Sequence, residues 1–138
     1  MKPKPAGEAR FRGPRVHGWV EVDDAPFDGG PDLPAHRRDG QPWPDGMQTK
    51  WQAWRSMPHA RLWGEADWQY ALDTAELAAS AFQKSAKVGL LTELRFREKQ
   101  MGTTWSARQD MHIRYVPPSD PDTPPAATVT RLEEYRDL

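Results

Sequence analysis

The spacing of the tryptophans constrains the fold of this chain more than any other feature. Four of its seven tryptophans lie in the run WQAWRSMPHARLWGEADW, residues 51–68. Met47, Trp51 and Trp54 follow the i, i+4, i+7 spacing of one helix face, and Pro58 disfavours helical geometry in the residue before it. We therefore expect a short helix that buries this stripe and ends just before the proline.

Large aromatic residues at helical spacing are more often core anchors than a platform on which nucleic-acid bases stack, because an amphipathic helix must bury its stripe. We interpret the tryptophans of this run as core residues and subunit contacts, together with three apolar residues further along the chain. The full set is Trp51, Trp54, Trp63, Trp68, Leu72, Leu94 and Tyr115.

An alanine-rich segment follows the tryptophan run and predicts a second helix, for which Asp67 is a suitable N-cap. The expected apolar face consists of Trp68, Leu72, Ala75, Ala79 and Phe82, widened by Ala71, Ala78 and Ala81. Side chains this small allow another helix to approach closely.

Two further helices complete the predicted core. The third runs from about Lys87 to Met101, where Gly102 is well placed as the C-terminal cap. The fourth begins after Thr103 or Thr104 and continues through about Tyr115, because Met111 and Tyr115 form an i, i+4 apolar pair. The sequence thus predicts a mainly α-helical protein with about four helices in residues 47–116.

Prolines and glycines concentrate at the two ends of the chain. Residues 1–46 show no sustained periodicity and predict an extended arm, whose strand-like piece, residues 16–22, could pair with the edge of a neighbouring subunit. Residues 117–138 combine a stiff proline-rich spacer with a predicted docking peptide. The apolar residues of that peptide, at helical spacing, are Leu132, Tyr135 and Leu138.

Four short helices bury little surface on their own. We therefore expect a homo-oligomer, in which neighbouring subunits supply the missing burial.

The net charge of −1 conceals blocks of opposite sign. Residues 1–20 sum to +4, residues 21–34 to −5 and residues 84–115 to +4. Such alternation suits self-association or an anionic partner on one face, although solvated helix faces look the same. The candidate contacts to DNA phosphates are Lys84, Lys87, Arg95, Arg97, Lys99, Arg108 and Arg114, with Arg10, Arg12 and Arg15 in the arm.

The sequence contains no motif for catalysis, a cofactor or a metal. It lacks cysteine, a Gly-rich loop ending in Lys-Ser/Thr, and a HExxH pair among its four histidines. It also lacks a membrane-spanning apolar stretch. These observations predict a soluble intracellular protein that is not an enzyme and carries no cofactor or metal.

The run WQAWRSMPHARLWGEADW, followed by the alanine-rich helix and LTELRFREKQMGTTWSARQDMHIRY, resembles the small terminase subunits of tailed bacteriophages, particularly those infecting actinobacteria. The resemblance covers about residues 18–116. Gly102, Thr103, Thr104 and Arg108 resemble the Gly-x-Thr…Arg element of the P27-like members, although Trp105 stands where those commonly have proline.

The resemblance implies a ring-forming, non-enzymatic protein of the host cytoplasm. Such a protein recognises double-stranded viral DNA and recruits and regulates the large terminase subunit, which carries the ATPase and nuclease. The alternative is a structural or adaptor protein of the virion, whose arms link neighbouring subunits without reading DNA.

Overall fold

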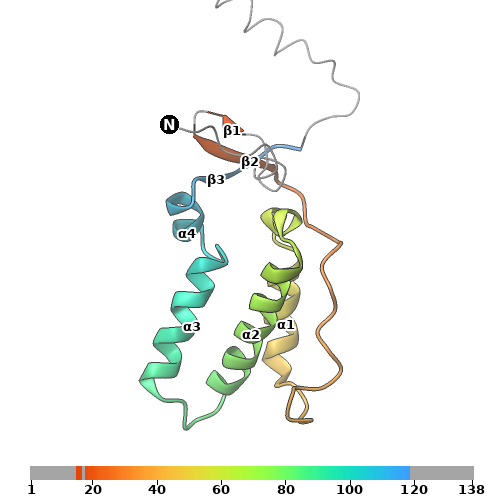
Figure 1. Ribbon diagram of the computed structural model, residues 1–138, viewed down its shortest axis with the longest axis vertical. Helices are drawn as coiled ribbons and strands as arrows, with labels where there is room; N and C mark the ends of the chain where they lie inside the picture. The colour runs from red at the N-terminus through yellow and green to blue at the C-terminus, as the bar shows by residue number, and fades with distance from the viewer. Residues whose placement is uncertain (1–14, 17, 119–138) are drawn as a thin grey trace, which may run out of the picture.

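Three helices lie side by side and a small sheet covers one end of them (Figure 1). The computed structural model describes residues 15–16 and 18–118. In chain order its elements are β1 (Arg15–Val16), β2 (Trp19–Asp23), α1 (Asp45–Arg55), the 3-10 helix η2 (Pro58–Leu62), α2 (Glu65–Ala81), α3 (Val88–Gln100), α4 (Trp105–Asp110) and β3 (Ile113–Val116). The described part of the chain is therefore mainly α, with four α-helices, as the sequence predicts.

Helix α1 supplies the largest side chains of the core. Met47, Trp51 and Trp54 are all buried along one face. The helix ends at Arg55, and Pro58 opens η2 three residues later. Trp51 packs against Trp54 and, at a ring separation of 6.2 Å, against Trp68 of α2.

Helix α2 begins three residues earlier than the sequence predicts. Gly64 is the N-cap, and Asp67 lies in the first turn, where its carboxylate accepts the Gly64 N–H at 2.9 Å. The buried face is made mainly of alanines, so that α1 and α3 pack close to its backbone, and it also holds Thr74. Phe82, expected on this face, is half exposed because it follows the last turn.

Residues 24–44 run along the outside of α1 without helix or strand (Figure 1). Two tryptophan indole N–H groups donate hydrogen bonds to backbone carbonyl oxygens of this proline-rich segment. Trp51 donates to Pro31, and Trp43 donates to Pro34. Arg37 joins the segment to α2 through an ion pair with Glu76 at 3.0 Å. Part of the range expected to form the arm thus packs on the helices, while residues 1–14 lie outside the described residues.

The predicted fourth helix is wrong over its last residues. Helix α4 ends at Asp110, His112 adopts a left-handed conformation with φ of 57°, and Ile113–Val116 form β3. The positive φ breaks the helix, and the alternation of apolar side chains in Ile113 and Tyr115 suits a half-buried strand. Met111 and Tyr115 are therefore not a helical pair.

The sheet has the order β1-β2-β3, with β1 antiparallel and β3 parallel to β2. Val20, Val22 and Ile113 form its buried face and pack with Leu62 of η2. We expected the strand-like piece at residues 16–22 to pair with a neighbouring subunit; in the structure, β2 pairs with β3 of its own chain. None of the helices in the described residues is long and apolar enough to cross a membrane.

Candidate nucleic-acid interface

A tight turn joins α3 to α4 and sets the angle between them. Gly102, with φ of 69°, donates its N–H to Lys99, and Thr103 donates to Glu98, which is the Schellman arrangement of a helix C-terminus. Thr104 then caps α4 by accepting the Ala107 N–H on its hydroxyl at 3.1 Å. The Gly-x-Thr element of the sequence therefore ends one helix and begins the next.

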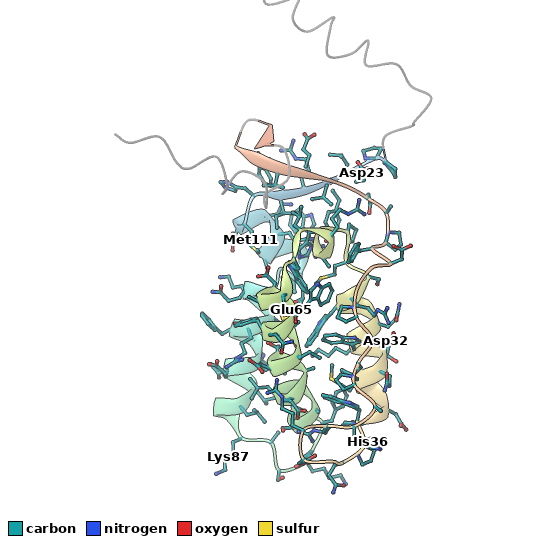
Figure 2. The ribbon with its side chains drawn as sticks, turned by 45° about the vertical axis from the view of Figure 1, so that its right-hand side comes forward. Asp23, Asp32, His36, Glu65, Lys87 and Met111 are labelled. Carbon is teal, nitrogen blue, oxygen red and sulfur yellow. The ribbon has the colours of Figure 1, made fainter. Side chains whose placement is uncertain are left out.

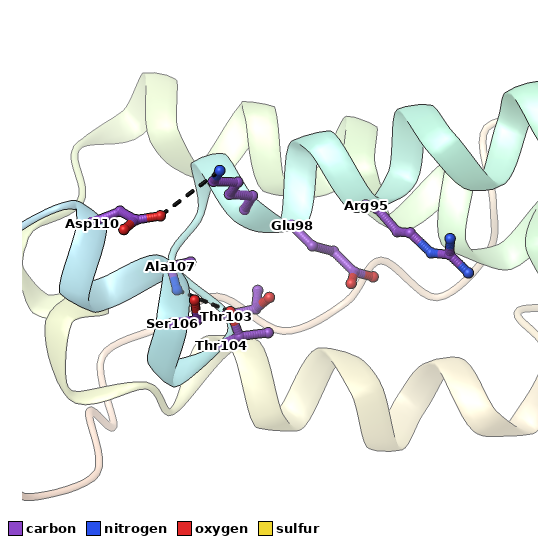
Figure 3. A pocket seen from close by; sticks show the side chains of 8 residues that line it. Arg95, Glu98, Thr103, Thr104, Ser106, Ala107 and Asp110 are labelled. Atoms are coloured by element: carbon purple, nitrogen blue, oxygen red, sulfur yellow. Dashed lines mark hydrogen bonds and ion pairs between the residues drawn. The ribbon is translucent and has the colours of Figure 1, made fainter.

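A cavity of about 250 Å³, open to solvent, lies between α3 and α4 (Figure 3). Lys99 reaches Asp110 at 3.8 Å across it. Glu98 forms an ion pair with Lys50 of α1, in which Oε1 of Glu98 lies 2.5 Å from the lysine nitrogen. This oxygen is buried and accepts no hydrogen bond within the described residues, so the lysine is its partner. Arg95 lines the same cavity and has no carboxylate partner among the described residues. The charged side chains of the lining are two cations and two carboxylates, and Arg95 is the one among them without an ion-pair partner in the described residues. Its lining is Arg95, Glu98, Lys99, Thr103, Thr104, Ser106, Ala107 and Asp110.

Several of the predicted DNA contacts are already engaged within the chain. Arg97 donates to Glu93 at 2.9 Å and lies over the ring of Tyr70; the hydrogen bond to Glu93 raises the pKa of Arg97. Arg108 donates to the Gly102 carbonyl and lies over the ring of Tyr115.

At the sheet, Arg114 lies over the ring of Trp19, and its guanidinium is 4.0 Å from Glu21. Together with Arg97 and Arg108, this residue holds elements of the chain against one another.

Three predicted contacts, Lys84, Lys87 and Arg95, are exposed and have no ion pair within the described residues. Lys84 lies in the connection between α2 and α3, and Lys87 is the N-cap of α3. Figure 2 shows Lys87 at the end of the molecule opposite to Asp23 and the sheet. The available positive charge therefore lies along α3 and its N-terminal end, away from the sheet.

Arg10, Arg12, Leu132, Tyr135 and Leu138 lie outside the described residues. Arg15 is the first residue of β1. Of the residues expected in the core, Leu94 is buried like Trp51 and Trp54. The remaining ones, half-buried against the two core clusters, are Trp63, Trp68, Leu72 and Tyr115.

No sequence pattern marks the buried polar node around His59, a residue that is only 1% exposed. Its Nε2 lies 2.8 Å from the Met101 carbonyl oxygen, and its Nδ1 lies 2.6 Å from the Tyr115 hydroxyl. Because a carbonyl only accepts, Nε2 carries the proton and Nδ1 accepts from the tyrosine. Burial lowers the pKa of His59 and raises that of Tyr115, so both are neutral. The node joins η2, α3 and β3.

Groups of three or more metal-binding side chains are absent from residues 15–16 and 18–118. A family model described as phage terminase small subunit matches residues 4–138. The chain belongs to this family. Terminase small subunits are generally non-catalytic, because the ATPase and nuclease activities lie in the large subunit. Comparisons with curated proteins and with solved structures gave no match. The P27-like, actinobacteriophage subtype stays a hypothesis.

Proposed function

We propose that this terminase small subunit recognises double-stranded viral DNA, and recruits and regulates the large ATPase-nuclease subunit while the genome is packaged in the host cytoplasm. Membership of the family supports a role in packaging. The distribution of unpaired basic side chains supports a DNA contact at α3 and its flanking turns, and we propose that contact there.

The main support for the DNA contact is the positive charge at the N-terminal end of α3. A helix concentrates about half a positive charge at its N-terminus, where acidic residues usually stabilise it. Helix α3 has no acidic residue in its first turn; instead Lys87 caps it and Lys84 precedes it. These lysines oppose the helix dipole, so they do not serve helix stability. A bound phosphate would offset both charges.

Arg95 extends this positive region along α3, beside the cavity shown in Figure 3. Thr103 and Ser106 on the opposite wall provide hydroxyl donors for the same phosphate backbone. The assigned set is therefore Lys84, Lys87 and Arg95. Arg97, Arg108 and Arg114 are assigned to holding the fold.

Salt-dependent binding tests this proposal. Fluorescence anisotropy with a labelled duplex should give an affinity that falls linearly with log salt, with a slope of about 0.9 per phosphate contact. Binding that is undetectable at low salt, or independent of salt, would contradict it.

The exposed apolar side chains support assembly into a homo-oligomer, and we propose a closed ring. Five large apolar residues are exposed in the described part, and Trp105 is 70% exposed. They are Phe82, Val88, Phe96, Trp105 and Met111. Isolated apolar residues are common on surfaces, but a tryptophan this exposed is typical of an interface. Native mass spectrometry should find one closed subunit number at micromolar concentration.

Recruitment of the large subunit is assigned to residues 130–138, beyond the proline-rich spacer. Deletion of residues 119–138 should leave DNA binding intact and remove stimulation of the large subunit's ATPase. Full stimulation by the truncated protein would place the docking site elsewhere.

The second candidate is a virion adaptor that assembles without reading DNA. The exposed apolar residues favour it as much as they favour a ring. It predicts the same assembly in native mass spectrometry but no salt-dependent DNA binding, so the anisotropy experiment separates the two.

A further inference from the structure

The side of α3 that faces away from α2 carries exposed apolar side chains. Leu94 is buried and marks the inward side of the helix. Val88, Thr92 and Phe96 recur every fourth residue on the outward side, where Val88 is 79% exposed and Phe96 is 55% exposed. In Figure 1 no other described element covers this side. These three residues, the α3 stripe, therefore have no partner within the described part of the chain.

The exposed charges that border the α3 stripe are positive. Lys87, Arg95 and Lys99 lie beside it and are exposed. Both glutamates of α3 already form ion pairs with basic residues of the same chain. The stripe therefore suits a surface that combines apolar residues with acidic ones.

A groove with apolar lining lies between α2 and residues 29–38. It consists of two adjoining cavities, open to solvent, of about 290 Å³ and 190 Å³, and Gln69 and Leu72 line both of them. The apolar members of the lining are Pro31, Pro34, Trp43, Trp68 and Leu72. The groove thus exposes apolar surface that nothing in the described residues covers.

The groove and the α3 stripe lie on different sides of the molecule. In Figures 1 and 2, α3 and the segment of residues 24–44 lie on opposite sides of α2. Helix α2 shows the same separation, because Tyr70 lies under Arg97 of α3 whereas Leu72, two residues later, lines the groove. One copy can therefore present both surfaces at the same time, each to a different neighbour.

The groove is acidic where α2 begins. Glu65 lines it in the first turn of α2, and Asp28 directly precedes Gly29 of the lining. Both acidic side chains are exposed and have no ion pair within the described residues. At the other end of the groove, the charge of Arg38 is offset by an ion pair with Asp73. The groove therefore complements the α3 stripe in both apolar surface and charge.

We propose that copies of this chain associate head to tail, with the α3 stripe of one copy lying in the groove of the next. The inference rests on the proposed ring and names the two surfaces that form it. A contact between two different surfaces is heterologous, and it generates a ring when the rotation between neighbours closes. Arg95 also lines the cavity towards α4, so it stays at the border of the contact, beside the surface proposed for DNA.

Disulfide cross-linking of the full-length protein tests the contact, because the chain has no cysteine. The test variant T92C/Q69C places one thiol in the middle of the α3 stripe and one where the two cavities of the groove adjoin. The matched control is T92C/Q52C, because Gln52 is exposed on α1 and lines neither cavity.

Under mild oxidation, the test variant should form covalent multimers up to the closed subunit number. They should form at least about tenfold faster than in the control, because thiols held across a formed contact have an effective concentration near the millimolar range. Equal rates for the two variants would overturn the interface. Rapid dimer formation by T92C alone would show that two α3 stripes meet each other, and a monomer-sized disulfide product would show that the two thiols meet within one chain; both results would overturn it.

Charge reversal tests the complementarity. Addition of D28K/E65K to the test variant should slow cross-linking at least about threefold at low salt, and added salt should reduce this difference. The control D24K/D45K reverses two exposed acidic residues outside the groove, of which Asp45 lies in the first turn of α1 as Glu65 does in α2. A rate that D28K/E65K leaves unchanged, or that both reversals slow equally, would overturn the proposed pairing.

Native mass spectrometry of the original protein separates this inference from the proposed function. A closed ring whose test and control variants cross-link equally would keep the proposed ring and remove this interface. A monomer would remove both, while the anisotropy experiment would still decide whether the protein binds DNA.

Discussion

The hydroxyl of Tyr115 lies 2.6 Å from Nδ1 of His59 and donates its proton to that nitrogen. The second ring nitrogen of His59 also forms a hydrogen bond, because its Nε2–H donates to the carbonyl oxygen of Met101 at the end of α3. The side chain of His59 therefore links the sheet to the helices. This node gives the first two predictions.

Substitution of Tyr115 by Phe should lower the free energy of unfolding by about 1–3 kcal/mol, because it leaves a buried nitrogen without its donor. Urea denaturation followed by tryptophan fluorescence measures the change. Tyr70→Phe is the control: Tyr70 is half-buried, and its hydroxyl makes no hydrogen bond within the described residues. Equal losses for the two variants would show that the hydrogen bond contributes nothing specific.

Acid should destabilise the protein through His59. Burial lowers the pKa of His59 in the folded state, whereas an unfolded histidine titrates near pH 6.5. Below about pH 6.5 the unfolded state binds the proton and the folded state does not, so the free energy of unfolding falls as pH falls. NMR titration of the folded protein should give a midpoint for His59 below pH 6.5. Removing His36 by H36Q should leave the effect in place.

Substitution of Gly102 by Ala should destabilise the protein, whereas substitution of Gly89 by Ala should not. Gly102→Ala forces a positive φ on a residue with a Cβ, and that Cβ would lie 3.0 Å from Nε2 of His59. We expect a loss of about 1–2 kcal/mol or more. A Cβ at Gly89, within α3, meets nothing within 4 Å, so Gly89→Ala should stabilise the protein by up to about 1 kcal/mol. Thermal unfolding of the two variants measures the difference. A Gly102→Ala variant as stable as the original protein would contradict the described turn.

Loss of Lys84 and Lys87 should flatten the salt dependence of DNA binding. For K84A/K87A we expect the slope of log affinity against log salt to decrease by about 0.9 for each lost phosphate contact. The control R38A/R61A removes the same charge from exposed residues outside α3. Circular dichroism should be unchanged in the test variant. If the control weakens binding equally, only net charge matters and the assignment to α3 is wrong.

Trp105 should matter more for assembly than for the stability of a subunit. Because its side chain is 70% exposed, Trp105→Gln should change the folding of a single subunit by no more than about 0.5 kcal/mol. If Trp105 lies in a contact between copies, the same change should lower the mass observed by light scattering at micromolar concentration. An unchanged mass would remove Trp105 from the proposed interface.

Local patterns predicted the helices because their causes are local. The stripe of Met47, Trp51 and Trp54, the proline after α1 and the glycine after α3 each act within a few residues. The end of α4 was missed because the strand that replaces it depends on β2, which lies far away in the sequence. A pair at helical spacing, such as Met111 and Tyr115, cannot reveal a distant strand partner.

The same limit applies to the candidate site. Spacing identified the basic residues of α3 and α4, but it could not separate Arg95 from Arg97, which has Glu93 one turn before it and Tyr70 of another helix beneath it. Nor could it place His59, whose partners come from two distant elements. Long-range pairing decides which cations remain available.

The parallel pairing of β2 with β3 determines the order in which the chain can fold during synthesis. β2 leaves the ribosome before any helix, whereas its partner follows roughly 90 residues later, at the end of a long loop that must be closed. Until then, β2 is paired only with β1, through Trp19 and Val20, in a two-stranded ribbon that is marginally stable in water. The helices can pack first, and the newly made chain carries β2 without β3 until Ile113–Val116 emerge. During that interval, the unpaired edge of β2 is open to pairing with other nascent chains.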